Sequence, residues 1–283
     1  MNVLIVGATS MIGKALAVRL AATGNRVRRA GRRDADVFFD LTQWLNPPEV
    51  RESFDVVVHA AADFGGPDDQ DAVRAEVVNA AGTLAVCALA KQVQARQVVL
   101  LSSLSATYQA GDAYFGIYAL SKRHGEELAR WYCQDHTLGL SILRPSQVYD
   151  DQGKGRQHQN LFYAIADRAK ACDQILFDGK RDARRNYIHL DDLVEVVFRV
   201  INQRILGEFV CAHPRSVHLS ELAKAAYAAY GCDREARFLT EKEDLTDLPA
   251  IHDFQIYELT GYHPRIDIKE GYTRIRAYRE ERT

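Results

Sequence analysis

Apolar runs alternate with helical periodicity through the first half of the chain. Continuous runs of Val, Ile and Leu predict buried strands at residues 2–8, 55–62, 97–103 and 138–146. Between them, apolar residues at helical spacing predict helices over 11–24, 72–92 and 118–133. Strands that are apolar throughout and separated by helices are typical of a parallel sheet covered on both faces. Such a sheet binds its ligands beyond the carboxyl ends of its strands.

The second half is less regular and predicts a smaller lobe. A polar, glycine-bearing stretch at 149–160 predicts a surface loop. Short helices and strands are predicted after it, at 161–172, 185–190, 191–201, 207–212 and 220–231. We expect an α/β fold with a doubly wound parallel sheet of Rossmann type, which forms a dinucleotide-binding domain over 1–146. Residues 147–283 are expected to form a smaller C-terminal α/β substrate-binding lobe, from which about 184–214 return to the Rossmann domain.

Charge and hydropathy exclude some partners. A net charge of −2 gives no general attraction to nucleic acid or acidic lipid, so neither is an expected partner and any anion site must be local. The apolar N-terminus is too short for a signal peptide, and no segment is expected to reach the length of a membrane span. A cytoplasmic protein is the simplest expectation.

Cysteines and histidines do not form a metal-binding pattern. The five cysteines are an odd number without a C-x-x-C spacing, which favours reduced thiols over a disulfide framework or a zinc site. No histidine pair has a ligand spacing such as H-E-x-x-H, so no metal is expected. His59 and His189 lie on apolar strands, where a histidine is more often buried and hydrogen-bonded than catalytic.

The motif GATSMIG joins the first predicted strand to the first helix. Glycine gives such a turn its backbone freedom, and the free N–H groups of the helix N-terminus face a bound pyrophosphate. Ser10 occupies the middle position, where a glycine is usual, and its hydroxyl is a further phosphate donor. This placement predicts a dinucleotide site with the candidate residues Gly7, Thr9, Ser10, Met11, Ile12 and Gly13.

The second strand is expected to end within RVRRAGRR, residues 26–33. NAD-binding sheets usually carry an acidic residue there, which accepts hydrogen bonds from the ribose hydroxyls. Here Ala30 and Gly31 are followed by Arg32 and Arg33, and a small residue followed by guanidinium groups suits the 2′-phosphate of NADP. We therefore expect NADP, with NAD as the alternative.

Candidate chemistry clusters after the strand at 97–103. Ser102, Ser103 and Ser105 compete as donors to a substrate oxygen, and ordinary turn serines are the other interpretation; we favour Ser103. In YALSK, Tyr118 and Lys122 fall one turn apart on one helix face, a spacing that is a weak signal by itself.

The stretch RRNYIHLDDL carries a candidate anion ligand. Arg185, in an expected polar cleft, suits a diphosphate. Asp191 and Asp192 are expected to cap the following helix.

These motifs occur together in one order. The glycine-rich turn, HAAA, NAAGT, SS, YALSK, LRPSQVY, RNYIHLDDL and LTGYHPRIDIKEGY resemble the extended short-chain dehydrogenase/reductase family, and in particular its nucleotide-sugar epimerase/dehydratase branch. The resemblance runs from residue 3 to about residue 278 and implies an enzyme in which Tyr118 and Lys122 are the catalytic pair and Ser103 the catalytic serine. The Lys122 ammonium and the positive nicotinamide would lower the pKa of the Tyr118 phenol towards neutrality.

The resemblance also implies binding residues. Asn79 would support the cofactor site, or else be a helix-interior residue bonded to backbone; Asp40 would lie near the adenine, or else cap a turn. The cofactor candidates thus also include Arg32, Arg33, Asp40, Leu41, Ala60, Ala61, Ala62, Asn79, Tyr118 and Lys122. The substrate candidates are Ser105, Asn160 and Arg185, the last two at the substrate diphosphate.

Several functions fit this resemblance. The leading hypothesis is an NADP-dependent reductase of a nucleotide-linked 4-keto sugar, and the nearest alternative is an NAD-dependent nucleotide-sugar 4-epimerase. A 4,6-dehydratase is not expected, because Leu104 and Ser105 stand where that type carries Asp and Glu. A reductase of a hydrophobic ketone and a non-catalytic NADP(H)-sensing regulator are further alternatives. The helices over 74–92 and 115–133 lie where family members form a dimer contact, so a homodimer is expected.

Overall fold

The computed structural model describes residues 1–43, 45 and 48–282. The chain divides into two compact units. The first comprises Met1–Pro145, Val194–Cys211 and Gln255–Tyr262, and the second Ser146–Leu193, Ala212–Phe254 and His263–Thr283. The returning segment 194–211 is shorter than the 184–214 expected from the sequence, and a second segment also rejoins the first unit.

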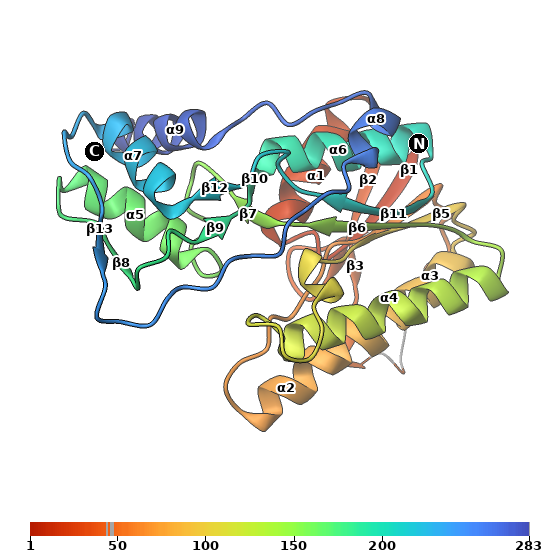
Figure 1. Cartoon of the computed structure of the whole chain (residues 1–283). Coiled ribbons are helices and arrows are strands. Elements are labelled where there is room, and N and C mark those ends of the chain that lie inside the picture. The colour runs from red at the N-terminus through yellow and green to blue at the C-terminus, as the bar shows by residue number, and fades with distance from the viewer. Residues whose placement is uncertain (44, 46–47, 283) are drawn as a thin grey trace. The chain divides into compact units, whose positions relative to one another are not determined.

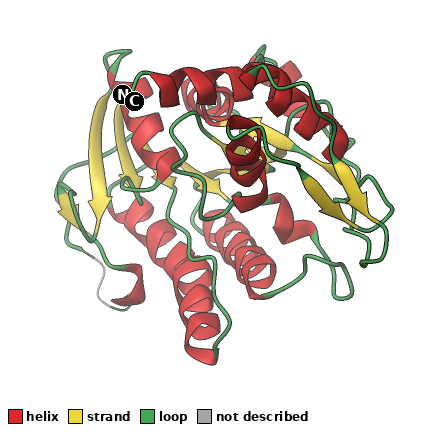
Figure 2. Ribbon diagram, turned by 90° about the vertical axis from the view of Figure 1, so that its left-hand side faces the viewer, coloured by secondary structure: helices red, strands yellow, loops and turns green. Residues whose placement is uncertain are grey.

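A seven-stranded parallel sheet forms the centre of the first unit, as the sequence predicted (Figure 1). Its order is β11-β6-β5-β4-β1-β2-β3, and every adjacent pair runs in the same direction (Figure 2). The strands are β1 (Asn2–Val6), β2 (Arg26–Gly31), β3 (Val37–Phe38), β4 (Val56–His59), β5 (Gln97–Leu101), β6 (Gly139–Pro145) and β11 (Gly207–Cys211). The order reverses between β1 and β4, which is where ligands of doubly wound sheets bind.

Helices cover both faces of this sheet. In Figure 1, α3 and α4 lie on one side and α1 and α6 on the other. The helices are α1 (Met11–Ala21), α2 (Asp69–Glu76), α3 (Gly82–Gln92), α4 (Ile117–Asp135), α6 (Leu190–Gln203) and α8 (Gln255–Thr260), with the π-helical turn η2 (Val77–Ala81) between α2 and α3. Val57, Leu89 and Leu100 are among the buried side chains that join α3 to the sheet in one apolar core. The apolar residues at helical spacing in the sequence are therefore those that face the sheet.

The second unit has its own aromatic core. Its helices are α5 (Asn160–Lys170), α7 (Leu219–Tyr230) and α9 (Ile268–Glu280). Short strands pair as β7 (Gln147–Tyr149) with β10 (Tyr187–His189), β9 (Arg184–Arg185) with β12 (Val217–His218), and β8 (Leu176–Asp178) with β13 (Arg237–Leu239). Phe162 of α5 stacks on Tyr272 of α9 at 4.6 Å between ring centroids, and both rings are buried. This packing gives the smaller lobe a hydrophobic centre separate from the sheet.

Two cysteines correct an expectation from the sequence. Cys172 and Cys232 form a disulfide, with their Cα atoms 5.8 Å apart, whereas Cys87, Cys133 and Cys211 are free and buried. The two partners are 60 residues apart in the chain and follow the ends of α5 and α7, so only the folded lobe brings them together. The expectation of uniformly reduced thiols was wrong for this pair. The cysteines therefore no longer support a cytosolic setting.

The helical segment Asp69–Gln92 corrects another expectation. It is 24 residues long with a window hydropathy of 1.4, so by length and composition alone it is apolar enough to cross a membrane. The sequence reasoning expected no such segment. Half of that window is buried inside the structure, as in the core helix of a water-soluble protein, and α3 packs against α4 and β5.

A close helix contact generates a stability prediction. Gly125 of α4 lies so near η2 that a Cβ atom would stand 2.3 Å from the Asn79 carbonyl oxygen. We expect Gly125→Ala to lower the free energy of unfolding by about 1–3 kcal/mol, because backbone atoms must move apart. Gly31→Ala is the control, since its Cβ would meet nothing within 4 Å. Urea denaturation of both variants measures the difference, and equal stabilities would contradict the packing described.

Candidate active site

The turn between β1 and α1 requires its two glycines. Gly7 has a φ of +82°, and a Cβ there would lie 2.4 Å from the Ala61 amide nitrogen. A Cβ on Gly13 would lie 2.5 Å from the Gly7 carbonyl oxygen. The backbone therefore approaches β4 more closely than any other residue type permits.

Ser10 forms the N-cap of α1. Its Oγ accepts a hydrogen bond from the Gly13 amide at 3.0 Å, which leaves its hydroxyl hydrogen free to donate. The N–H groups of Met11 and Ile12 belong to the first helical turn, where the helix supplies no acceptors. Together with exposed Thr9, these donors fit an anionic pyrophosphate.

Two arginines that follow β2 have no ion-pair partner among the described residues. Arg32 and Arg33 are exposed and form no ion pair with any residue that the structure describes. Arg26, by contrast, pairs with Glu52 at 2.6 Å. Ala30, at the strand end, is fully buried. The small residue and the unpaired guanidinium groups occupy the edge where the sequence predicted a 2′-phosphate site.

The other cofactor candidates mainly have structural contacts near the carboxyl ends of the strands. Asp40 Oδ1 accepts from the Thr42 amide at 3.0 Å and hydroxyl at 2.8 Å, so it caps the turn η1 (Leu41–Gln43). This geometry matches the turn-cap alternative. Leu41 is buried and lies beside Gly82. Ala60, Ala61 and Ala62 follow β4, and Ala61 forms the close contact with Gly7 described above.

Asn79 connects the segment after β4 to α4. It is 1% exposed, and its Oδ1 accepts from the Asp63 amide at 2.9 Å. Its Nδ2 donates to the Asp63 carbonyl at 2.6 Å and to Ser121 Oγ at 2.9 Å. Asn79 therefore acts on the site through the residues it holds in place.

Tyr118 and Ser103 lie in contact. Ser103 lies close enough to the partly buried Tyr118 phenol to lower its pKa through a side-chain hydrogen bond, and Ser103 Oγ accepts from the Ser105 amide at 3.1 Å. Phe64 stacks on the Tyr118 ring with centroids 4.6 Å apart and an interplanar angle of 14°. Of the three candidate serines, Ser103 is thus the one bonded to Tyr118, while Ser102 Oγ donates to Glu126 Oε1 at 2.6 Å. Ser105 lies in the turn η3 (Leu104–Thr107).

Lys122 is buried at the end of β5. It is 3% exposed, and its Nζ donates to the Leu101 carbonyl oxygen at 2.7 Å. Burial lowers the pKa of Lys122 to about 8, and the charge of Glu126 opposes this shift. Lys122 therefore remains mainly charged at neutral pH, with a pKa much closer to neutrality than that of an exposed lysine.

The pKa of the Tyr118 phenol is raised among the protein's own groups, whereas the sequence predicted a lowered pKa in the presence of the cofactor. Burial raises the pKa of Tyr118 to about 12, and the Ser103 hydrogen bond lowers it by less. Among the protein's own groups, desolvation of the phenolate dominates this pKa. The lowering expected from Lys122 together with the positive nicotinamide stays a prediction. The site therefore holds Tyr118 as a neutral hydrogen-bond and proton donor.

The histidines are buried as expected. His59 is 1% exposed and its Nε2 lies 3.1 Å from Thr83 Oγ1. His189, with Asp151 and Asp191, forms a trio whose ligand atoms lie within 4.8 Å of one another. Its Nδ1 accepts from the Asp191 amide at 3.1 Å, so its Nε2 is the protonated nitrogen and donates to Asp151 at 2.9 Å. Both ring nitrogens are thus engaged in hydrogen bonds.

The substrate candidates in the second unit differ in exposure. Asn160 is exposed at the first residue of α5. Arg185 is 5% exposed, and its Nη1 donates to the Arg184 and Thr246 carbonyls, each at 2.8 Å. The Arg185 side chain is therefore buried and bonded to backbone carbonyls. Asp192, in the first turn of α6, accepts from the amides of Arg265 and Ile266.

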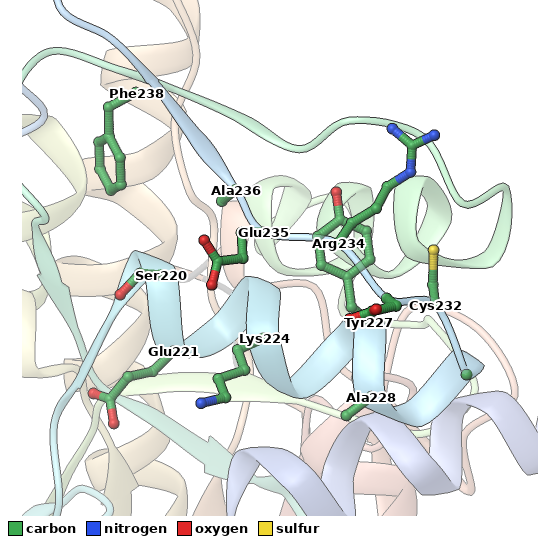
Figure 3. A pocket seen from close by; sticks show the side chains of 12 residues that line it. Ser220, Glu221, Lys224, Tyr227, Ala228, Cys232, Arg234, Glu235, Ala236 and Phe238 are labelled. Carbon is green, nitrogen blue, oxygen red and sulfur yellow. The ribbon is translucent and has the colours of Figure 1, made fainter.

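A groove of about 830 Å³ lies elsewhere in the second unit (Figure 3). It runs between α7 and residues 231–238, with Lys224 and Glu235 at its rim and Tyr227 in its wall. The Tyr227 hydroxyl already bonds to the Asp173 carbonyl and the Ile175 amide. None of the site residues predicted from the sequence lines this groove.

Two neighbours of the catalytic candidates were missed by the sequence reasoning. Phe64 belongs to no motif that was considered, and its stacking on Tyr118 comes from the chain path after β4. Glu126 carried a usable signal, because it lies one helical turn beyond Lys122 and so on the same helix face. A carboxylate at that position is buried with the lysine.

Comparison with known proteins gives a match over most of the chain. The model of the NAD dependent epimerase/dehydratase family matches residues 3–211. A dTDP-4-dehydro-6-deoxy-D-allose reductase from Streptomyces bikiniensis is 27% identical over 151 residues, which are 49% of this chain and 45% of that protein. The match therefore covers less than half of that relative's length.

Solved structures share the fold across their full length. The UDP-glucose 4-epimerase of Thermotoga maritima, solved with UDP-glucose, superimposes with a TM-score of 0.78 at 17% identity and covers 100% of both chains. RMD from Pseudomonas aeruginosa, complexed with NADPH, gives a TM-score of 0.81 at 18% identity, covering 100% of this chain and 99% of that one. At these identities the likeness is one of fold.

Buried His59 generates a prediction of pH-dependent stability. Burial, and then the charge of Lys122, lower the pKa of His59 to about 3 from 6.5. The unfolded chain therefore binds a proton that the folded chain does not, and the stability contributed by neutral His59 is lost as pH falls from about 6.5 towards 3. Between pH 7 and pH 5 the wild type should lose about 2 kcal/mol more than His59→Gln.

Denaturant unfolding at several pH values measures this difference. His252→Gln is the control, because His252 is exposed, and it should follow the wild type. If the His59→Gln and wild-type stability curves stay parallel over this pH range, His59 is not held neutral by the fold.

Proposed function

The chain belongs to the NAD dependent epimerase/dehydratase family, a family of NAD(P)-dependent enzymes that act on nucleotide sugars, and from this premise we propose that it is an NADP-dependent reductase of a nucleotide-linked 4-keto sugar. The contact between Ser103 and Tyr118 beside buried Lys122 carries the proposal, because it assembles a proton donor at the edge of the sheet where the cofactor turn lies. The proposed catalytic residues are Ser103, Tyr118 and Lys122.

The residues of the first unit fit a dinucleotide. The glycine turn has no space for a side chain, and the first turn of α1 offers donors to a pyrophosphate. Tyr118 and Lys122 would contact the ribose and nicotinamide end. When bound, the cofactor supplies a hydride to the carbonyl carbon of the sugar. Arg32 and Arg33 favour NADPH over NADH, since they have no ion-pair partner among the described residues.

Tyr118 would act as the general acid. In the reductive direction, its hydroxyl gives a proton to the substrate oxygen as the carbonyl becomes an alcohol. A pKa raised to about 12 by burial keeps the phenol protonated at neutral pH, which suits a proton donor. Ser103 would donate a hydrogen bond to the same substrate oxygen and stabilise the charge that develops there. Lys122 would place a positive charge beside the phenolate that remains.

Substrate recognition is proposed to use residues of both units. We propose that exposed Asn160 and, after a rearrangement of its present hydrogen bonds, Arg185 contact the substrate diphosphate, with Ser105 near the sugar. The reductase relative acts, by its name, on a dTDP-linked 4-keto sugar, and the epimerase structure contains UDP-glucose. These relatives support a nucleotide-sugar substrate.

The nearest alternative is an NAD-dependent 4-epimerase, which the UDP-glucose 4-epimerase likeness favours. An epimerase oxidises and re-reduces the same carbon and returns its cofactor unchanged, whereas a reductase releases NADP in each turnover. The unpaired arginine pair after β2 favours the reductase.

Assembly and location extend the proposal. We propose a homodimer through α2, α3 and α4, where Val73 is 64% exposed and Trp131 is 59% exposed. A cytoplasmic location is likewise a proposal, and the Cys172–Cys232 disulfide counts against it.

Removal of the phenolic hydroxyl tests the chemistry. With NADPH and a panel of dTDP- and UDP-linked 4-keto-6-deoxy sugars, we expect Tyr118→Phe to lower kcat by roughly a hundredfold or more, because the general acid is lost. Tyr278→Phe on α9 is the matched control and should retain full activity. The change in NADPH absorbance measures the rate. Equal rates for Tyr118→Phe and wild type on every keto sugar that the wild type reduces would refute the enzyme assignment.

The arginine pair predicts cofactor preference. We expect Arg32→Ser combined with Arg33→Ser to weaken NADPH binding by roughly 10- to 100-fold and to leave NADH binding nearly unchanged, because only NADPH carries the 2′-phosphate. Arg26→Ser, which breaks the pair with Glu52 instead, is the control. Fluorescence titration with both cofactors measures the affinities, and equal losses for NADPH and NADH would argue against an NADP site.

A further inference from the structure

Glu126 is a buried carboxylate directly behind the proposed catalytic residues. It is 2% exposed on α4, one turn after Lys122. Oε1 accepts from Ser102 Oγ at 2.6 Å and from Arg144 Nε at 2.8 Å. Oε2 accepts from Arg144 Nη2 at 2.5 Å and from Arg130 Nη2 at 2.8 Å. Each carboxylate oxygen thus accepts two hydrogen bonds, which fixes the position of Glu126.

These bonds join three elements at the carboxyl end of β5. Ser102 is the residue after β5, and its amide also donates to the Leu143 carbonyl of β6 at 2.8 Å. Arg144 lies on β6, and Glu126 on α4. The peptide before Ser102 presents the Leu101 carbonyl that accepts from Lys122 Nζ, and the residue after it is Ser103, which bonds to Tyr118. The Ser102–Glu126 bond therefore sets the position of both contacts.

We propose that Glu126 is a positioning residue for the proposed reaction: its carboxylate holds the end of β5 against α4 and keeps the Lys122 ammonium charged and bonded to the Leu101 carbonyl. This inference rests on the proposed function for the roles of Tyr118, Ser103 and Lys122. The positions of the Lys122 ammonium and of the carboxyl end of β5 do not depend on which substrate the protein uses.

The charges around Lys122 and Glu126 define what a substitution changes. Lys122 faces Glu126 on its own helix and neutral His59 on β4, with the Tyr118 phenol one turn earlier. Glu126 faces Arg130 on α4 and Arg144 on β6. Glu208 on β11 pairs with the same two arginines, through Arg130 Nε at 2.5 Å and Arg144 Nη2 at 2.6 Å.

Glu208 therefore provides a matched control. Glu126→Gln and Glu208→Gln each remove one negative charge from the same arginine pair. Of these two carboxylates, Glu126 contacts Ser102 and lies one helical turn after Lys122, whereas Glu208 lies on β11 with a side chain that is 36% exposed. A purely structural role predicts lower stability for both variants and no selective change at Lys122.

The experiment reads the charge of Lys122 without any substrate. Protein carrying ¹³C-labelled lysine side chains is titrated by NMR, and the Lys122 signal is assigned by its loss in Lys122→Met. The wild-type signal should inflect near pH 8, consistent with the lowered pKa of Lys122. In Glu126→Gln the inflection should move to lower pH by roughly one unit, because the opposite charge has gone. In Glu208→Gln it should stay at the wild-type value.

Two outcomes overturn the proposal: no shift in Glu126→Gln, or equal shifts in both variants. If Glu126→Gln does not fold, Ser102→Ala carries the test, since it removes the tie to β5 and leaves every charge in place. Its Lys122 inflection should also fall, because the Leu101 carbonyl is no longer held at the ammonium, and an unchanged inflection overturns the proposal. A failed reductase assignment would leave these titrations unaffected, so the two failures are distinguishable.

Discussion

The structure of the candidate site depends on a buried ammonium bonded to a strand end. An uncompensated charge inside a protein costs several kcal/mol, so Lys122 needs an acceptor, and the Leu101 carbonyl supplies it at 2.7 Å. That bond fixes α4 against the carboxyl end of β5. Because Tyr118 lies one turn before Lys122, and Ser103 two residues after Leu101, the same bond brings the phenol and the hydroxyl together.

Burial then sets the protonation states that the chemistry uses. The same desolvation raises the pKa of Tyr118 and lowers the pKa of Lys122, so the phenol is held neutral, while the ammonium keeps its charge at neutral pH with a smaller margin than an exposed lysine. Glu126 opposes the second shift from behind the strand end. A proton donor and a nearby cation at one edge of a dinucleotide-type sheet are the parts that carbonyl reduction requires.

The sequence was most informative where local geometry dictates residue type. Gly7 and Gly13 were predictable, because a turn this close to β4 has no space for a Cβ, and the strands were predictable because buried parallel strands are apolar throughout. The Tyr118–Lys122 spacing became informative only with the ordered motifs around it. The Cys172–Cys232 pair, the burial of Arg185 and the bond from Ser102 to Glu126 depend on contacts between distant segments, which no local pattern records. The rise in the pKa of Tyr118 caused by burial likewise follows from packing.

Isotope transfer tests the central claim most directly. NADPH carrying deuterium at the transferable nicotinamide position is incubated with the protein and a nucleotide-linked 4-keto sugar, and the product is analysed by NMR. The account predicts deuterium on the sugar carbon that bore the carbonyl, with one NADP released for each alcohol formed. A product without deuterium at that carbon, or no net oxidation of NADPH, would contradict it.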